Sequence, residues 1–194
     1  MSMHPAPHAL ERFVQVYDNA LPPALCAKMI DSFHALERFQ RPNGQGQRAG
    51  LEQSRWTELD ISALSDPGFR SMLLHNMHTH LQRYVDSLGL TIPVPATENI
   101  SELIIKRYRA GGDDSFQPHF DSLGPVSNRY LVFIWYLNDV TQGGETEFVD
   151  LGLEVKPATG RLLVFPPYWM FQHAGRPPLS NDKYILSTYF LFSP

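Results

Sequence analysis

The stretch Gln117-Pro118-His119-Phe120-Asp121 carries an imidazole and a carboxylate two positions apart. Side chains of an extended strand alternate between its two faces, so His119 and Asp121 point to one side and can bind one ion while Phe120 packs the other way. Pro118 fixes its own φ and keeps Gln117 out of helical geometry, which favours the extended conformation. We therefore predict a strand at an edge or rim of a sheet that presents a metal-binding pair.

A second imidazole from far along the chain would complete a face of two histidines and one carboxylate. His173 is the candidate, in a stretch Phe171-Gln172-His173-Ala174-Gly175 that follows an apolar segment. Three ligands on one face leave the opposite coordination positions open for substrate and oxygen. Lys183 follows ten positions later, and this combination favours iron. Taken alone, a His-x-Asp tripeptide is most often a pair of ordinary polar residues on the surface, so the surrounding motifs decide whether it binds a metal.

The order of motifs from Ile100 onward supplies that context. It runs Tyr108, Pro118 to Asp121, Tyr136-Leu137-Asn138-Asp139-Val140, Gly143 to Phe148, Gly160 to Phe165, His173-Ala174-Gly175 and Lys183-Tyr184. This order resembles the iron(II)- and 2-oxoglutarate-dependent dioxygenases, and within them the prolyl 4-hydroxylase-like branch. The resemblance implies a distorted double-stranded β-helix, a cupin-like jelly roll, in which His119, Asp121 and His173 bind Fe(II).

The resemblance also implies how the cosubstrate is held. Lys183 would bind the distal carboxylate of 2-oxoglutarate, with hydroxyls from Tyr108 and Thr146 beside it. A buried dianion needs a fixed positive partner, and an ammonium group on a strand supplies one. Alternatively, Tyr108 could be an ordinary core tyrosine and Thr146 an ordinary strand residue. Arg129 and Arg161 are lower-ranked candidates for binding the 2-oxoglutarate carboxylate. O2 is the other implied substrate, and ascorbate enters as a further reductant.

The implied reaction is hydroxylation of a C–H bond with release of succinate and CO2, and the branch suggests a peptidyl proline. The aromatic residues Tyr168, Trp169 and Phe171 could receive an extended Pro-rich segment, or they could be core. An apolar lining that excludes water from the metal could come from Phe120, Trp135, Phe148 and Phe165.

Two other functions stay open. The same ligands could hold zinc in a hydrolase, with Glu145 or Glu147 as the base. Against this, nothing in a hydrolase needs Lys183, and the chain has no His-Glu-x-x-His motif. The third possibility is a non-catalytic jelly-roll binding module, since such folds host many functions.

Length and composition limit the remaining possibilities. A chain of 194 residues suffices for one domain, and we expect residues 1–194 to form a single one. The net charge of −4 provides no basic field for nucleic acid or an anionic membrane. One cysteine, Cys26, fits a reducing compartment, and no apolar run approaches the roughly 18 residues of a membrane span. We expect a cytoplasmic protein acting on a peptide or small molecule, with no metal role for His4 and His8.

Residues 1–98 are predicted to give helical support. Prolines 22 and 23 suit the first turn of a helix that should run to about Phe39. A second helix is predicted over Pro67–Leu88, with Asp66 as its N-cap and Gly89 as its stop. On that helix His78 and His80 diverge by about 200°, so we interpret them and His75 as solvated or packed residues.

Residues 40–55 are rich in Gly, Gln and Arg, and are predicted to form a mobile loop. The loop is either a solvated connection or a lid that brings Arg41, Arg48 and Arg55 to the substrate.

Residues 99–194 are predicted to form the jelly-roll core. A strand over Asn99–Arg109 would turn Tyr108 toward the metal, and Arg129–Leu137 is apolar on both faces, as in a central strand covered on both sides. Further strands are predicted at Glu145–Val149, Leu153–Lys156, Arg161–Phe165 and Lys183–Phe192. The pattern favours a mainly β fold, with two sheets and the early helices packed on the outer sheet.

Overall fold

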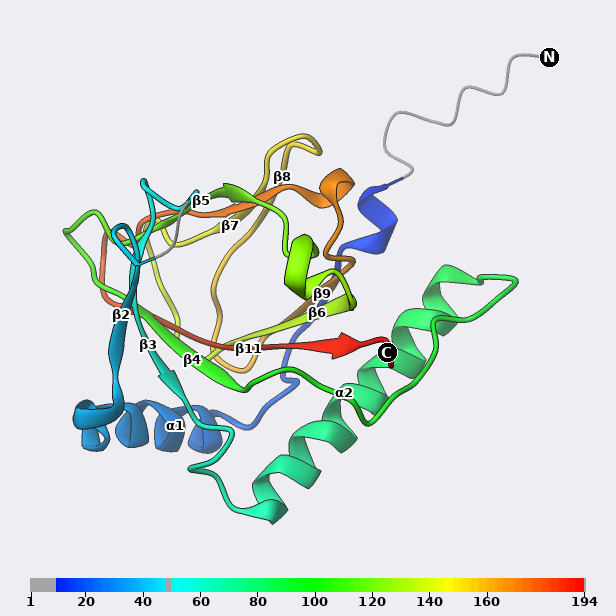
Figure 1. Ribbon diagram of the computed structural model, residues 1–194, viewed down its shortest axis with the longest axis horizontal. Helices are drawn as coiled ribbons and strands as arrows, with labels where there is room; N and C mark the ends of the chain where they lie inside the picture. Colours follow the sequence, from blue (N-terminus) through cyan, green and yellow to red (C-terminus); the bar gives the residue numbers. More distant parts are fainter. Residues whose placement is uncertain (1–9, 48–49, 194) are drawn as a thin grey trace.

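The structure is a computed structural model that describes residues 10–47 and 50–193. His4, His8 and Arg48 lie outside the described residues. The described chain forms two antiparallel sheets that face one another, with two helices on the outer side of the larger sheet (Figure 1). The larger sheet contains, in spatial order, β1 (Gln15–Tyr17), β9 (Leu162–Phe165), β6 (Arg129–Tyr136), β11 (Lys183–Leu191), β4 (Ile104–Tyr108), β3 (Arg55–Asp60) and β2 (Arg41–Gly44).

The smaller sheet covers one face of the larger one. Its spatial order is β5 (Phe116–His119), β10 (His173–Gly175), β7 (Thr146–Phe148) and β8 (Leu153–Val155). The helices are α1 (Pro23–Ala35) and α2 (Pro67–Leu88), and short 3-10 turns occur at η1 (Glu11–Phe13), η2 (Glu37–Phe39), η3 (Gly124–Val126) and η4 (Trp169–Phe171). This arrangement confirms the predicted mainly β, two-sheet fold with helices outside.

Strand β6 shows why the molecule has two hydrophobic cores. Every residue from Tyr130 to Tyr136 is buried, because successive side chains enter different cores. Phe133 and Trp135 pack toward the helices, whereas Val132 and Ile134 pack between the sheets. The predicted central strand covered on both sides is confirmed.

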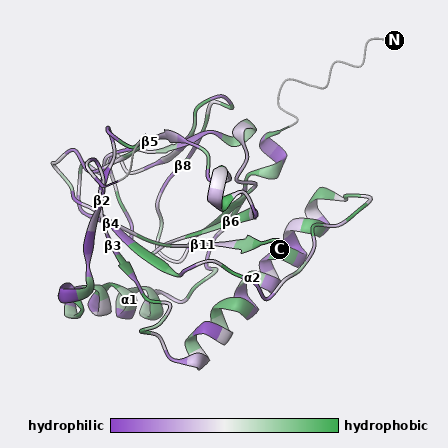
Figure 2. Ribbon diagram, in the orientation of Figure 1, coloured by the Kyte–Doolittle hydropathy of each residue, from purple (hydrophilic) through white to green (hydrophobic). Residues whose placement is uncertain are grey.

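Helix α2 begins and ends where the sequence predicts. The Asp66 carboxylate accepts a hydrogen bond from the Phe69 N–H (2.9 Å), and Gly89 ends the helix at φ 58°. Figure 2 shows hydrophobic and hydrophilic residues mixed along α2, as expected for a helix with one buried side. The His78 and His80 rings each contact a backbone carbonyl oxygen, of Thr97 and Asn76 respectively, so both are packed in place. Neither described helix combines the length and apolar composition needed to cross a membrane.

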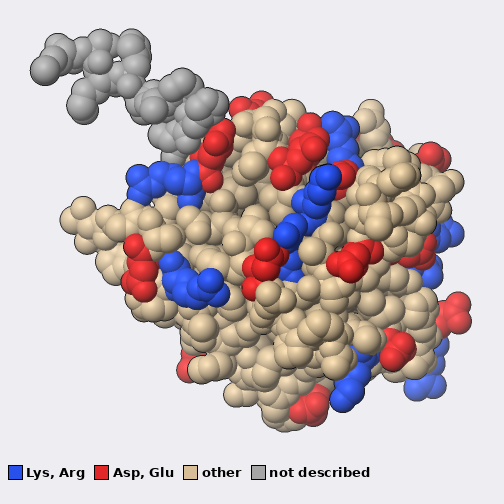
Figure 3. Space-filling view, turned by 180° about the vertical axis from the view of Figure 1, so that it is seen from behind, with Lys and Arg blue, Asp and Glu red and all other residues tan. Residues whose placement is uncertain are grey.

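The first half of the chain is less helical than expected. Strands β1, β2 and β3 all come from residues 1–98 and join the larger sheet, so the description of this region as helical support is wrong in part. The predicted loop over 40–55 is also too long, because Arg41–Gly44 pairs with Arg55 and the residues after it. The first helix ends at Ala35, four residues early. Charges of both signs are interspersed on the face opposite to that of Figure 1 (Figure 3).

Candidate metal centre

Pairing of two short strands brings the predicted metal ligands together. His119 at the end of β5 lies directly across from His173 at the start of β10, and Asp121 follows β5 by two residues. Asp121 Oδ1 lies 3.5 Å from His119 Nε2, and Asp121 Oδ2 lies 3.4 Å from His173 Nε2. Donor atoms bound at roughly 2.1 Å to one octahedral ion lie about 3 Å apart, so this spacing suits a single metal. Strand β5 is an edge strand, as predicted.

Backbone carbonyls orient both imidazoles. His119 Nδ1 donates to the Gln117 carbonyl (2.8 Å), and His173 Nδ1 donates to the Phe171 carbonyl (3.0 Å). With the proton held on Nδ1, the lone pair of each Nε2 faces the shared centre. Asp121 is fixed by its own backbone N–H, which donates to Pro167 (3.0 Å).

The protonation states suit a cation. Burial, with a contribution from the neighbouring His119, lowers the pKa of His173 to about 4, so its imidazole is neutral at pH 7. Burial alone would raise the pKa of Asp121, but the two histidines outweigh it and hold that pKa well below its usual range. An anionic carboxylate beside imidazole nitrogens is the donor set that non-haem iron and zinc both accept.

Aromatic rings enclose the centre. Phe116 stacks on His119 with ring centroids 3.6 Å apart, and Phe165 meets the His173 ring edge-on at 4.7 Å. Phe148 lies 5.8 Å from the same ring, so two of the predicted walls, Phe148 and Phe165, are in place. Trp135 was wrongly predicted, because it sits on the helix-facing side of β6.

Lys183 lies deep in the same cavity. It opens strand β11 as predicted, is 2% exposed, and donates from Nζ to the Gly144 carbonyl (2.8 Å). Its Nζ also lies 4.7 Å from the centroid of the Tyr108 ring. Tyr108 is the residue of β4 that pairs directly with Lys183 of β11. Burial lowers the pKa of Lys183 to about 7, so an anionic partner would stabilise its protonated, charged form.

The two predicted hydroxyl groups line this cavity as well. Tyr108 is 2% exposed, and burial raises its pKa well above the ordinary value, so it stays a donor. Thr146 accepts a hydrogen bond from the hydroxyl of Tyr136 (2.7 Å). Lys183, Tyr108 and Thr146 therefore share one cavity with His119, Asp121 and His173.

The structure separates the lower-ranked candidates. Arg161 forms an ion pair with Asp18 (2.7 Å) at the surface. Arg129 stays near the centre: it lies 3.9 Å over the Tyr189 ring and donates to the Asp121 carbonyl. Of the aromatic run, Phe171 belongs to the core between the sheets, while Trp169 is 64% exposed.

Several cavity residues escaped the sequence analysis. Lys106, Phe116, Ser187 and Tyr189 all line the cavity. Strand alternation could have identified Lys106, which is two positions before Tyr108, and Ser187 and Tyr189, which are four and six after Lys183. Phe116 had no such signal, because its position depends on where β5 begins.

A family model described as the 2OG-Fe(II) oxygenase superfamily matches residues 103–191. This chain contains a 2OG-Fe(II) oxygenase domain. The match to the oxygenase domain includes every predicted metal and cosubstrate residue, from Tyr108 to Lys183. The family match implies Fe(II), 2-oxoglutarate and O2, as the sequence predicts, and the donor set described above fits Fe(II). Ascorbate stays a prediction.

Relatives of the oxygenase domain include prolyl 4-hydroxylase subunits. The alpha-1 subunit of Gallus gallus is 28% identical over 136 residues, which cover 61% of this chain and 24% of that subunit. The alpha-2 subunit of Gallus gallus is 29% identical over 127 residues, or 56% of this chain and 22% of that subunit. The chain thus spans about a quarter of the length of these curated relatives.

Solved structures confirm the double-stranded β-helix fold of the oxygenase domain. A Pseudomonas putida prolyl-4-hydroxylase superposes with a TM-score of 0.68 at 18% identity, covering 94% of both chains. A 2OG complex of the viral collagen prolyl hydroxylase from Paramecium Bursaria Chlorella virus-1 gives 0.62 at 18% identity, with 94% and 97% covered. A Trichoplax adhaerens prolyl hydroxylase in complex with a hypoxia inducible factor peptide fragment gives 0.69 at 13% identity, with 93% and 84% covered.

Proposed function

We propose that this protein is an Fe(II)- and 2-oxoglutarate-dependent dioxygenase that hydroxylates a peptidyl proline and releases succinate and CO2. One observation carries the proposal: two imidazoles and a carboxylate converge in the same cavity as a fully buried lysine. Prolyl hydroxylases among the relatives and the solved structures support proline as the target. The structural neighbour bound to a peptide supports a peptide substrate.

In this proposal His119 Nε2, His173 Nε2 and a carboxylate oxygen of Asp121 hold the iron. Bound iron with 2-oxoglutarate supplies the oxidising chemistry that uses O2 at the C–H bond. The chain contributes geometry: hydrogen bonds from each Nδ1 to a backbone carbonyl fix the ring orientations. Phe116, Phe148 and Phe165 exclude water from the centre.

Lys183 binds the distal carboxylate of 2-oxoglutarate in the proposal. A buried ammonium without an anionic partner is costly, and the lowered pKa of Lys183 expresses that cost. The Tyr108 and Thr146 hydroxyls lie on the same cavity wall and can donate to the same anion. Binding of the dianion therefore gives the Lys183 ammonium an anionic partner inside the cavity.

Two variants test the centre without requiring a substrate. Titration of metal-free protein with Fe(II) and 2-oxoglutarate under nitrogen should produce a visible metal-to-ligand band. His173→Ala should abolish it, whereas His78→Ala, which removes a packed histidine on α2, should leave it unchanged. Lys183→Met should raise the Kd for 2-oxoglutarate by about 30-fold or more, because losing one partner of a buried charge pair costs about 2–5 kcal/mol. An unaltered band in His173→Ala would remove the assignment.

The class of substrate is tested by measuring succinate release. Proline-containing peptides should stimulate succinate formation and gain one oxygen atom by mass, whereas free amino acids and nucleic acids should not. Stimulation by a small molecule only would remove the peptidyl proline but leave the oxygenase.

The zinc hydrolase alternative is weakened by the position of its base. Glu147 lies on the outer face of β7, where Arg176 Nη2 meets its carboxylate at 2.5 Å. Glu145 acts instead on Lys183, whose pKa its charge raises against the larger lowering by burial. Hydrolysis without O2 or 2-oxoglutarate would nevertheless favour zinc. The cytoplasmic location remains a prediction from composition.

A further inference from the structure

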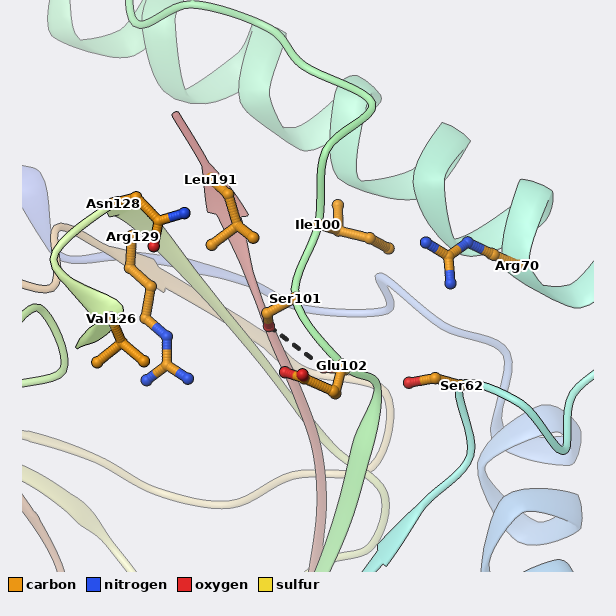
Figure 4. A pocket seen from close by; sticks show the side chains of 9 residues that line it. All are labelled: Ser62, Arg70, Ile100, Ser101, Glu102, Val126, Asn128, Arg129 and Leu191. Carbon is orange, nitrogen blue, oxygen red and sulfur yellow. Dashed lines mark hydrogen bonds between the residues drawn. The ribbon is translucent and has the colours of Figure 1, made fainter. Parts of the chain in front are cut away.

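The cavity at the metal centre opens toward the surface on the side away from Lys183. Phe116 and Asp121 line both this cavity and an outer chamber that reaches Glu102 and Arg129. Those last two residues also line a surface groove of about 340 Å³. In Figure 4 Arg129 and Arg70 stand on opposite sides of this groove, with Glu102 between them. A substrate therefore has a route from the groove to the metal, and Lys183 lies at the far end of the cavity.

The Lys183 end of the cavity is closed. Lys183, Tyr108 and Thr146 are all buried there, and so is Gly144. A 2-oxo acid that reaches from the metal centre to the Lys183 ammonium must fit the distance between them, because the closed end leaves no room for a longer chain to extend into solvent.

Both ends of this distance are held in place. Hydrogen bonds from Nδ1 of His119 and of His173 to backbone carbonyls fix the two imidazoles. At the other end, Lys183 Nζ donates to the Gly144 carbonyl (2.8 Å). A Cβ on Gly144 would lie 3.4 Å from Lys183 Cδ, so the backbone of this glycine, with φ 76°, lies directly against the lysine stem. The ammonium therefore has little freedom to move toward a shorter acid or away from a longer one.

Strand β10 connects the two ends. His173 and Gly175 are two positions apart, so they face the same cavity, roughly 7 Å from each other along the strand. A Cβ on Gly175 would lie 3.8 Å from Lys183 Nζ and 3.3 Å from the Cβ of Phe116, which pairs with Gly175 across β5. Phe116 is itself stacked on His119, so it has no free space into which to withdraw on that side. The missing side chain of Gly175 therefore leaves open a space beside the ammonium.

That space suits the distal carboxylate of the acid. A carboxylate oxygen accepts a hydrogen bond from an ammonium at about 2.8 Å, which is closer to Nζ than a Cβ on Gly175 would be. A methyl group at this position and the carboxylate would compete for the same side of the Lys183 ammonium. In a packed, closed cavity such a conflict is not relieved by a small shift of the neighbours.

We propose that Gly175 sets the length of the 2-oxo acid: its missing side chain leaves room for the distal carboxylate of a five-carbon acid against Lys183, and the cavity rejects acids one methylene shorter or longer. This inference rests on the proposed function, and it adds a specificity-determining residue for the cosubstrate. Gly175 acts through the space that it leaves, whereas Lys183 supplies the charge.

The test compares three 2-oxo acids that differ by one methylene each: oxaloacetate, 2-oxoglutarate and 2-oxoadipate. On Fe(II)-loaded protein under nitrogen, the metal-to-ligand band gives a Kd for each acid without turnover. In the parent protein the Kd values for the shorter and the longer acid should exceed that for 2-oxoglutarate by about 10-fold or more. Gly175→Ala should raise the Kd for 2-oxoglutarate by about 10-fold or more and that for oxaloacetate by less than about 3-fold, because the shorter acid ends before the added methyl group.

Gly112→Ala is the matched control. An added Cβ on Gly112 meets no atom of the described residues within 4 Å, and neither Gly112 nor Gly175 has a positive φ, so both substitutions add one methyl group without backbone strain. Gly112→Ala should bind all three acids as the parent protein does. Binding of Co(II) alone and the Tm report whether Gly175→Ala retains its metal centre and its fold.

Equal Kd values for the three acids in the parent protein would overturn the inference and leave the proposed function standing. A loss in Gly175→Ala that is equal for all three acids, or that is accompanied by weaker Co(II) binding, would overturn it as well. If Gly175→Ala does not fold, the preference of the parent protein among the three acids decides. Failure to hydroxylate any peptide would remove the proposed function alone, since these Kd values are measured without a peptide. If no acid produces the band, both fail.

Discussion

A lysine with a lowered pKa makes cosubstrate binding pH-dependent. Burial lowers the pKa of Lys183 to about 7, with Lys106 contributing in the same direction and Glu145 opposing it. Between that value and the ordinary pKa of about 10.5, the folded apo-protein binds fewer protons than the unfolded chain. Its stability therefore rises with pH across this window and is lost as pH falls toward 7.

A bound dianion raises the pKa of Lys183 again, so 2-oxoglutarate should bring a proton with it. At pH 8 we expect close to one proton taken up per molecule bound, and at pH 6 close to none. Calorimetry in buffers of different ionisation enthalpy measures this on protein already loaded with Fe(II) under nitrogen. Lys183→Arg, which stays protonated throughout, should bind without uptake. Equal uptake in parent and variant would assign the proton to another group.

Single residues were predictable where chemistry and strand alternation agree. His119 and Asp121 lie on one side because they are two apart in an extended segment, and His173 was found through the order of motifs. Trp135 was misplaced because β6 is apolar on both faces, and composition does not tell which face meets the metal. Lys106 was overlooked because a charged residue in a strand suggests solvent until the second sheet is in view.

Among the elements, the β2–β3 hairpin departs furthest from the sequence analysis. Gly44 takes φ 94°, and an added Cβ there would collide with the Ser54 carbonyl, so the glycine allows the hairpin to close. The Gly- and Gln-rich composition suggested a loop, but β3 gains its order from pairing with β4 and from burial of Trp56. Such long-range partners are invisible in a local pattern.

Gln117 ties the end of this hairpin to the metal centre. Its side-chain oxygen accepts from the Gln53 N–H (2.9 Å) and its amide donates to the Gly50 carbonyl (2.9 Å), while its own carbonyl orients His119. Gln117→Ala should therefore speed hydrogen exchange at Gln53 by about 30-fold, since two hydrogen bonds of about 1 kcal/mol each are lost. Exchange measured by mass spectrometry checks this.

Gln82→Ala on the exposed side of α2 is the control and should leave that exchange unchanged. A raised KM for substrate in Gln117→Ala would support the predicted lid, and an unaltered KM would favour a solvated connection. Unchanged protection at Gln53 in Gln117→Ala would show that the hydrogen bonds do not hold the segment.

The hydrophobic core under the helices and the one between the sheets share the larger sheet. Phe33 of α1 is fully buried and meets the Tyr184 ring edge-on at 5.7 Å, one residue from Lys183. The sequence revealed the layers because apolar periodicity marked α2 and β6. It divided the chain wrongly at residue 98, because strand partners from the first half lie far away in sequence. The helices and the larger sheet should therefore unfold together.

Phe33→Ala tests that cooperativity. Removing a buried phenylalanine ring costs about 3–5 kcal/mol, which should lower Tm by roughly 10 °C in a chain of this size. Near-UV circular dichroism, which reports aromatic packing, and loss of the Fe(II)–2-oxoglutarate band should shift together, because β11 carries both Tyr184 and Lys183. Phe39→Ala removes the same ring from a site that is 45% exposed and should change Tm far less. If the band kept its parent midpoint in Phe33→Ala while the helices melted early, residues 1–98 would be a separable support after all.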